Sequence, residues 1–98
     1  LNHLHPSGII IVDSGAEKAI LQNKSLLPSG VLDIKGNFSR GDILSILNEK
    51  NIKIGIGVIA YDHSEAKKII GKKSKEIKFL LGYEGRDEII HKDDLVKV

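Results

Sequence analysis

Residues 71–96 read GKKSKEIKFLLGYEGRDEIIHKDDLV, and this stretch decides how the fold is expected to end. Ile77, Leu80 and Leu81 recur at helical spacing, which predicts a helix from Ser74 to Leu81 with one apolar face. A glycine ends this helix, and a charged turn and a short apolar run follow it. The stretch therefore predicts a helix, a turn and a closing strand.

Period-two and helical patterns predict the remaining elements upstream. Ser14 and Glu17 have capping-box spacing at the start of a helix that runs to about Asn23. The segment 62–65 starts a second helix, which Gly71 interrupts. The predicted strands cover residues 9–12, 31–35, 43–47, 52–61 and 94–98.

Two of the predicted strands have informative faces. In the strand 31–35, simple alternation predicts that Leu32 and Ile34 share one face. In the strand 52–61, Gly55 and Gly57 share a face, and their bare backbone favours a bulge, a barrel corner or the close approach of another element. The order of elements predicts a mainly β fold, in which about five to six mostly antiparallel strands curl into a small barrel with two to three short helices.

The composition limits the class of protein. A chain of 98 residues forms one domain, because two halves would each be too short to bury a core. It has no cysteine, so neither a disulfide framework nor a thiolate metal site is expected. No apolar run approaches the roughly 20 residues of a membrane span, so we expect a soluble cytoplasmic protein with no membrane partner. The chain has no methionine and begins at Leu1, so we expect a fragment of a longer polypeptide.

The net charge of +2 is too small to indicate nucleic-acid binding, but the charge is unevenly distributed. Residues 64–81 carry six lysines against two glutamates, whereas residues 82–94 carry five acidic residues against two basic ones. This difference in sign between neighbouring segments is more informative than the small net charge.

No catalytic, cofactor-binding or metal-binding residues are expected in this chain. The segment 71–74 superficially resembles a phosphate-binding loop, but Ala66 stands where that loop needs a glycine and Lys73 interrupts its final tripeptide. His91 has acidic neighbours but no nucleophile at a suitable spacing, so a structural or surface role is expected for it.

The residues do allow a nucleic-acid surface near the first helix. Lys18, Lys24 and the turn 27–31 offer cations and free backbone N–H groups, which are the groups that phosphate contacts require. The alternative is an ordinary solvated face, since aromatic platforms for stacking bases are scarce.

Four motifs in this order resemble the C-terminal PUA domain of bacterial glutamate 5-kinase. The most specific is the stretch 71–96, and the other three are IVDSGA at 11–16, SLLPSGV at 25–31 and GNFSRGD at 36–42. The hairpin 48–51 departs from the pattern because it lacks a glycine that relatives often carry.

The resemblance implies a PUA pseudo-barrel over residues 9–98, and a linker over residues 1–8 from an upstream amino-acid-kinase domain that is absent here. It implies a parent enzyme that phosphorylates L-glutamate with ATP in proline biosynthesis and that forms a homo-oligomer. The ATP and Mg²⁺ sites of such an enzyme would lie in its kinase domain. This chain would therefore be non-catalytic.

For this chain itself, the resemblance implies an accessory or regulatory module of RNA-binding type. The alternatives are a genuine RNA-binding module, and a packing or oligomerisation domain without affinity for RNA. In RNA-modifying relatives the first helix and the following loop face RNA. The corresponding residues here are Lys18, Lys24, Ser25, Leu27, Pro28, Gly30 and Val31.

Overall fold

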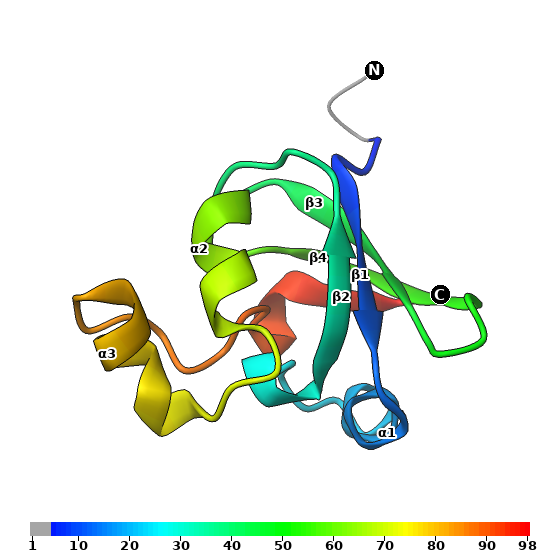
Figure 1. Ribbon diagram of the computed structural model, residues 1–98. Coiled ribbons are helices and arrows are strands. Elements are labelled where there is room, and N and C mark those ends of the chain that lie inside the picture. The colour runs from blue at the N-terminus through cyan, green and yellow to red at the C-terminus, as the bar shows by residue number, and fades with distance from the viewer. Residues whose placement is uncertain (1–4) are drawn as a thin grey trace.

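The computed structural model describes residues 5–98, which fold around one five-stranded sheet (Figure 1). The strands are β1 (Gly8–Val12), β2 (Val31–Lys35), β3 (Ile43–Leu47), β4 (Lys53–Val58) and β5 (Leu95–Lys97). The α-helices are α1 (Ser14–Leu21), α2 (His63–Ile69) and α3 (Ile77–Leu81). Short 3₁₀ helices are η2 (Pro28–Gly30), η3 (Ser74–Glu76) and η4 (Lys92–Asp94).

The sheet has the strand order β2-β1-β3-β4-β5. β1 and β3 are parallel, and the other three neighbouring pairs are antiparallel. The predicted mainly β fold with a mostly antiparallel sheet is therefore confirmed. β1 lies between β2 and β3, and β3 runs in the same direction as β1.

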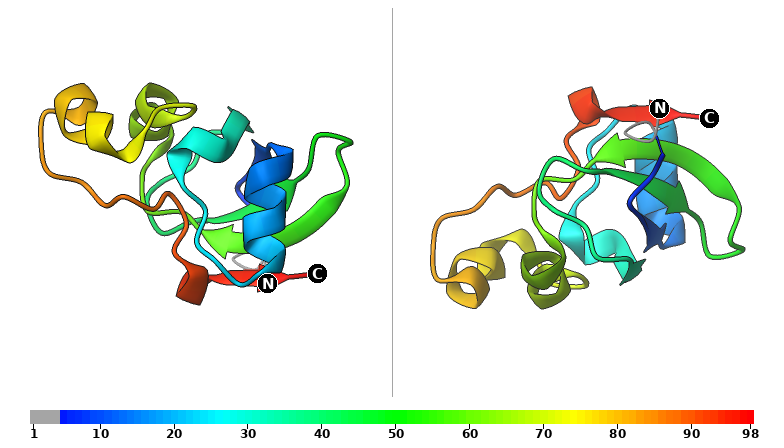
Figure 2. Two further views of the ribbon diagram at one scale, coloured as in Figure 1. Left: turned by 90° about the horizontal axis from the view of Figure 1, so that it is seen from below. Right: turned by 90° about the horizontal axis from the view of Figure 1, so that it is seen from above.

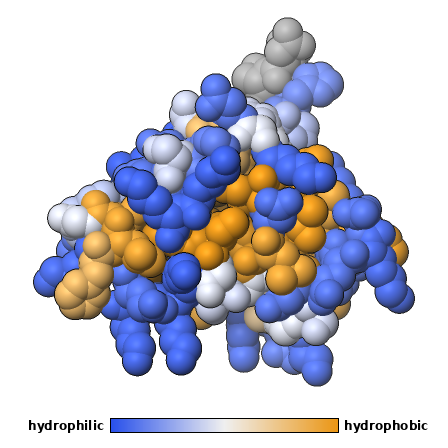
Figure 3. Space-filling model, in the orientation of Figure 1, coloured by the Kyte–Doolittle hydropathy of each residue, from blue (hydrophilic) through white to orange (hydrophobic). Residues whose placement is uncertain are grey.

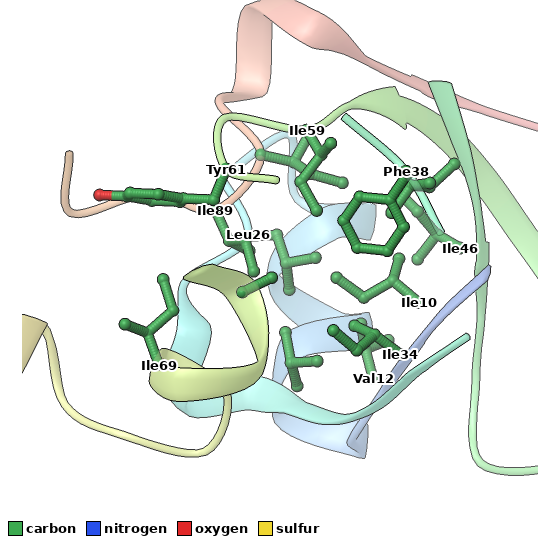
Figure 4. Close-up of a cluster of buried hydrophobic side chains, with 14 of the residues drawn as sticks. Ile10, Val12, Leu26, Ile34, Phe38, Ile46, Ile59, Tyr61, Ile69 and Ile89 are labelled. Atoms are coloured by element: carbon green, nitrogen blue, oxygen red, sulfur yellow. The ribbon is translucent and has the colours of Figure 1, made fainter. Parts of the chain in front are cut away.

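One apolar core fills the space between the sheet and the segments that cover it (Figure 4). Each of its large aliphatic side chains contributes about 1.5–3 kcal/mol when it is removed from water. The largest fully buried side chains are Tyr61, Ile10, Ile20, Leu26, Leu44, Ile46, Ile59, Ile69, Ile77, Ile89, Ile90 and Val12.

The prediction for β2 is wrong in its phase, because Leu32 is exposed while Val31 and Ile34 are both buried. A β-bulge explains the difference. Ile11 pairs with Asp33 but Val12 pairs with Val31, so Leu32 is the extra residue on β2. A bulge shifts the alternation by one residue, and this shift brings Val31 back to the core.

The prediction for the start of α1 is also wrong, whereas that for α2 is confirmed. Asp13 is the N-cap of α1, and its Oδ1 accepts the amide N–H of Ala16 at 2.8 Å. Ser14 is thus the first helical residue, and α1 ends at Leu21. At α2, by contrast, Asp62 and Glu65 form a complete capping box.

The two glycines of β4 face the core, where other elements approach closely. A Cβ on Gly57 would lie 2.7 Å from Cγ2 of Ile90, and one on Gly55 would lie 2.8 Å from the carbonyl of Val96. The close approach predicted from the sequence is therefore confirmed. β4 is shorter than predicted, because the chain leaves the sheet after Val58.

The hairpin between β3 and β4 lacks glycine and is fixed by asparagines. Asn51 has a φ of 62°, a left-handed conformation that asparagine tolerates better than most residues. The side chain of Asn48 accepts the amide N–H groups of Lys50 and Ile52 at 2.9 and 3.0 Å. Its amide also donates to Glu17 at 3.1 Å, which ties the hairpin to α1.

The segment after α3 returns to the body of the domain. Figure 2 shows it running along the outside of the molecule from α3 to η4. Leu26 and Ile90 then form an isolated antiparallel bridge, and Ala60 donates its N–H to the carbonyl of Ile89 at 2.9 Å. The end of the stretch 71–96 is thereby held between the loop after α1 and the end of β4.

The first strand, β1, begins at Gly8. The predicted linker 1–8 falls partly on residues 1–4, which lie outside the described residues, so the domain boundary stays a prediction. Within residues 5–98, no helix has the length and apolar character needed to cross a membrane.

Replacement of Asn48 by alanine tests how the hairpin is fixed. The side chain is 9% exposed and makes three hydrogen bonds. We expect Asn48→Ala to lower the free energy of unfolding by about 2 kcal/mol, because it leaves nearly buried polar groups without partners. Chemical denaturation measures the loss, and the exposed Asn37→Ala should change stability by less than about 0.5 kcal/mol. Equal stability of both variants would show that the bonds are unimportant.

Candidate functional site

A hollow of about 470 Å³ lies between α1, the loop that follows it and the returning C-terminal segment. We call it the α1 hollow. It is lined by Asp13, Gly15, Ala16, Ala19, Lys24, Ser25, Leu27, Ser29, Gly30 and Glu88. Small residues of α1 form part of its wall, so a ligand could approach the helix backbone closely.

Close packing of α1 on η2 determines the shape of the hollow. The backbone N–H of Asp13 donates to the carbonyl of Gly30 at 2.9 Å. A Cβ on Gly30 would lie only 2.6 Å from Cβ of Ala16, so glycine is the residue that permits this contact. The first turn of α1 and the end of η2 therefore form one rigid unit.

Four of the seven predicted surface residues line the α1 hollow. They are Lys24, Ser25, Leu27 and Gly30. Lys24 is exposed, and the Leu27 side chain is 42% exposed, so both are accessible to a ligand. Ser25 has a structural contact as well, because its Oγ accepts the amide N–H of Lys92 at 2.8 Å.

The other three predicted residues lie elsewhere. Lys18 is exposed on α1 but is not part of the lining. Pro28 is buried, and its carbonyl accepts the N–H of Gly71 at 2.7 Å. Val31 is 3% exposed. Pro28 and Val31 thus shape the turn from within rather than present a surface.

The sequence did not indicate that acidic residues belong to the hollow. Glu88 lies 58 positions after Gly30, and the bridge of Leu26 to Ile90 helps to hold it there. Asp13 is also present, although its Oδ1 serves as the cap of α1. The lining thus carries two carboxylates against the ammonium of Lys24, so it is not a strongly positive site.

Six of the 13 lysines lie on a different part of the molecule. The six lysines of residues 64–81 are exposed on α2, η3, α3 and the turn between them. Phe79 on α3 is 86% exposed beside them in the sequence. Figure 3 shows hydrophobic residues gathered in the middle of one face, with hydrophilic residues around them.

The remaining candidates for chemistry have structural contacts. Nδ1 of His91 accepts the amide N–H of Asp93 at 3.1 Å and so caps η4. The ring of His63 packs edge-on against Phe38. Among residues 5–98, no three histidine or acidic side chains come together as ligands for a metal ion.

The model of the PUA domain matches residues 8–81. Residues 82–98, which supply Ile89 and Ile90 to the core, lie beyond that match.

Among curated proteins, the chain is similar to glutamate 5-kinase from Agrobacterium fabrum strain C58. The two are 53% identical over 95% of this chain, but that region is 24% of the relative. Glutamate 5-kinase from Brucella anthropi is 51% identical over 96% of the chain and 25% of the relative. The chain thus spans about a quarter of the length of the curated relatives that it matches, and it corresponds to their C-terminal portion.

Solved structures share the fold. A PUA domain from Aeropyrum pernix K1, crystallised with tartrate, has a TM-score of 0.65 and 26% identity over 87% of this chain and 41% of that one. A chain of an H/ACA RNP bound to a substrate RNA has a TM-score of 0.64 and 18% identity, and the match covers 93% of this chain and 23% of that one.

A pair of exchanged residues tests the packing that shapes the hollow. Gly30→Ala should cost about 1–3 kcal/mol of stability, because its methyl group would overlap that of Ala16. Ala16→Gly alone should cost about 1 kcal/mol through helix propensity. Chemical denaturation of both variants and of the double variant measures the coupling. The double variant should be more stable than the sum of the two losses predicts, and strict additivity would contradict the contact.

Proposed function

The chain belongs to the PUA domain family, and we propose that it is the accessory domain of a glutamate 5-kinase. The parent enzyme would phosphorylate L-glutamate with ATP in the cytoplasm, in proline biosynthesis. The observation that carries this proposal is the 53% identity to such a kinase over 95% of the chain. ATP and Mg²⁺ would bind in the rest of the parent, since this chain corresponds to only about a quarter of the length of such a kinase.

The isolated chain should have no kinase activity. Phosphoryl transfer depends on groups that position the nucleotide phosphates and Mg²⁺. Purified chain, incubated with L-glutamate, ATP and Mg²⁺, should release no ADP above the rate without glutamate. The parent enzyme from the same source is the positive control, and clear glutamate-dependent turnover by the isolated chain would overturn the proposal.

For the domain itself, we propose RNA binding through the α1 hollow. The support is geometric, because Lys24 and Leu27 stand exposed around a hollow that is large enough for a base. Lys24 would contact phosphate, as would Lys18 on the neighbouring face of α1. The structural neighbour in an RNA-bound H/ACA RNP makes this class of ligand reasonable for the fold.

The acidic residues of the hollow define what kind of contact it makes. A phosphate placed inside would be repelled by Glu88, whereas an unpaired base would not. A carboxylate accepts hydrogen bonds from the exocyclic amine of cytosine, for example. We therefore propose that phosphates bind to Lys24 at the rim and to Lys18 on α1 outside the hollow, and that a splayed base enters the hollow.

Replacement of Lys24 tests this arrangement. Lys24→Gln should weaken binding of structured RNA. It should also reduce the magnitude of the slope of log K against log[salt] by about 1. Lys35→Gln is the matched control, since Lys35 is an exposed lysine at the far end of β2. Fluorescence anisotropy at two salt concentrations measures both. No binding by the unaltered chain at low salt, or equal losses in both variants, would contradict the proposal.

A second candidate function, a contact with the rest of the parent enzyme, is favoured by the exposed surface of α3. Phe79 is 86% exposed, and Tyr83 is 41% exposed beyond the end of the helix. The hydroxyl of Tyr83 donates a hydrogen bond to Glu65. This bond raises the pKa of Tyr83 to about 12, so the ring is held against α2 as a neutral phenol.

Replacement of Phe79 in the parent enzyme tests this contact. Light scattering should show a changed oligomer mass for Phe79→Ser, whereas Lys75→Ser should leave the mass unchanged.

A further inference from the structure

The two arginines of this chain line the same hollow. Of the 15 lysines and arginines in the chain, the other 13 are lysines. Arg40 belongs to the turn before β3, and Arg86 belongs to the segment after α3, yet both border a hollow of about 270 Å³. This hollow, which we call the arginine hollow, is closed on its other sides by Gly41, residues 58–60 and Asp94.

The backbone that presents Arg40 is firmly held. Asp42 accepts the amide N–H of Ser39 through its carboxylate at 2.8 Å and closes the turn. Gly41 donates to the carbonyl of Ile59 at 2.9 Å, which fixes the turn to the end of β4. The Nε of Arg40 donates to the carbonyl of Ala60 at 3.1 Å, so the guanidinium itself is oriented while its outer N–H groups stay available.

The backbone that presents Arg86 is held by a buried tyrosine. The hydroxyl of Tyr61 donates to the carbonyl of Arg86 at 2.6 Å. Tyr61 is 1% exposed, and burial raises its pKa, so the phenol remains a donor at neutral pH. Gly85 packs directly on this ring, with no room for a Cβ. Two separate loops are thus fixed with an arginine on each.

Neither guanidinium is paired with a carboxylate. In the part of the chain that the structure describes, no acidic oxygen lies within 4.0 Å of Arg40 or Arg86, although Asp94 borders the same hollow. Asp94 leaves the hollow with a net charge of +1. Two guanidinium groups that border one hollow and have no carboxylate partner are suited to an oxyanion, because guanidinium binds phosphate through paired N–H donors.

We propose that the arginine hollow binds a phosphate group. Its volume is below the 300–1,000 Å³ range of pockets for drug-sized ligands and suits a small charged group. The site is independent of the α1 hollow, which shares no lining residue with it. The phosphate could be carried by a nucleic acid or by a small phosphorylated molecule, and the chemistry of recognition is the same.

Titration with inorganic phosphate at constant ionic strength tests the site, with the arginine Nε–H signals of the ¹⁵N-labelled chain as the readout. Both arginine signals and the amide of Gly41 should shift saturably. Arg86→Gln should weaken binding at least about fivefold, which corresponds to about 1 kcal/mol. Arg86 is the preferred position, since its side chain makes no hydrogen bond to any other group within residues 5–98, and Arg86→Lys should restore only part of the affinity.

Lys50→Gln is the matched control, because it removes the same charge on the hairpin between β3 and β4. It should change the affinity less than about 1.5-fold, which is less than 0.3 kcal/mol. An equal loss of phosphate affinity in Lys50→Gln would overturn the proposal. So would a failure to saturate below about 50 mM phosphate, since a site that weak has a binding free energy under about 2 kcal/mol.

Competition identifies the source of the phosphate. If a nucleic acid carries it, a short single-stranded RNA should displace inorganic phosphate from both arginines. If a small molecule carries it, a nucleoside monophosphate should do so and RNA should not. Lys24→Gln should leave phosphate binding at the arginine hollow unchanged. A failure of phosphate binding at the arginine hollow can therefore be distinguished from a failure of RNA binding at the α1 hollow.

Discussion

The arrangement of this domain depends on the bridge between Leu26 and Ile90. Leu26 donates to the carbonyl of Ile90 and accepts from the amide of Ile89, both at 2.9 Å. All three side chains are at most 1% exposed, so these hydrogen bonds form inside the apolar core, where a missing partner costs most. Through this bridge, a segment near the C-terminus becomes part of the wall around the first helix.

The bridge also explains why two hollows flank one short segment. Glu88 lines the α1 hollow, and Arg86, two residues earlier, lines the arginine hollow. The carbonyl of Ile89 accepts the N–H of Ala60, which fixes the segment to the end of β4 as well. Residues 82–98 lie beyond the match to the family model, yet they complete both sites. A binding property of this chain can therefore differ from that of other PUA domains.

Much of the fold could be predicted from local patterns. β3 has the predicted bounds, and the capping box at Asp62 marks the start of α2. The two errors have different physical causes, one that acts across the sheet and one within the first turn of α1. The bulge at Leu32 depends on pairing with β1, and Asp13 is preferred to Ser14 as the cap because its carboxylate reaches the amide of Ala16.

The candidate site could be predicted only in part. Lys24 and Leu27 can be predicted as surface residues because they lie in a motif next to a helix. Long-range contacts, however, decide which residues share a hollow. Nothing in the local sequence indicates that Glu88 reaches α1, or that Arg40 and Arg86 face one space. Burial of Pro28 and Val31 likewise depends on the tertiary structure around η2.

Native-state hydrogen exchange of the Leu26 and Ile89 amides tests the central role of the bridge most directly. If the bridge is part of the cooperative core, both amides should exchange only through global unfolding, with the same free energy as the amides of β1 and β3. Exchange of Leu26 and Ile89 at a markedly lower free energy, while the sheet stays protected, would contradict the account. The C-terminal segment would then be a detachable cover rather than part of the framework.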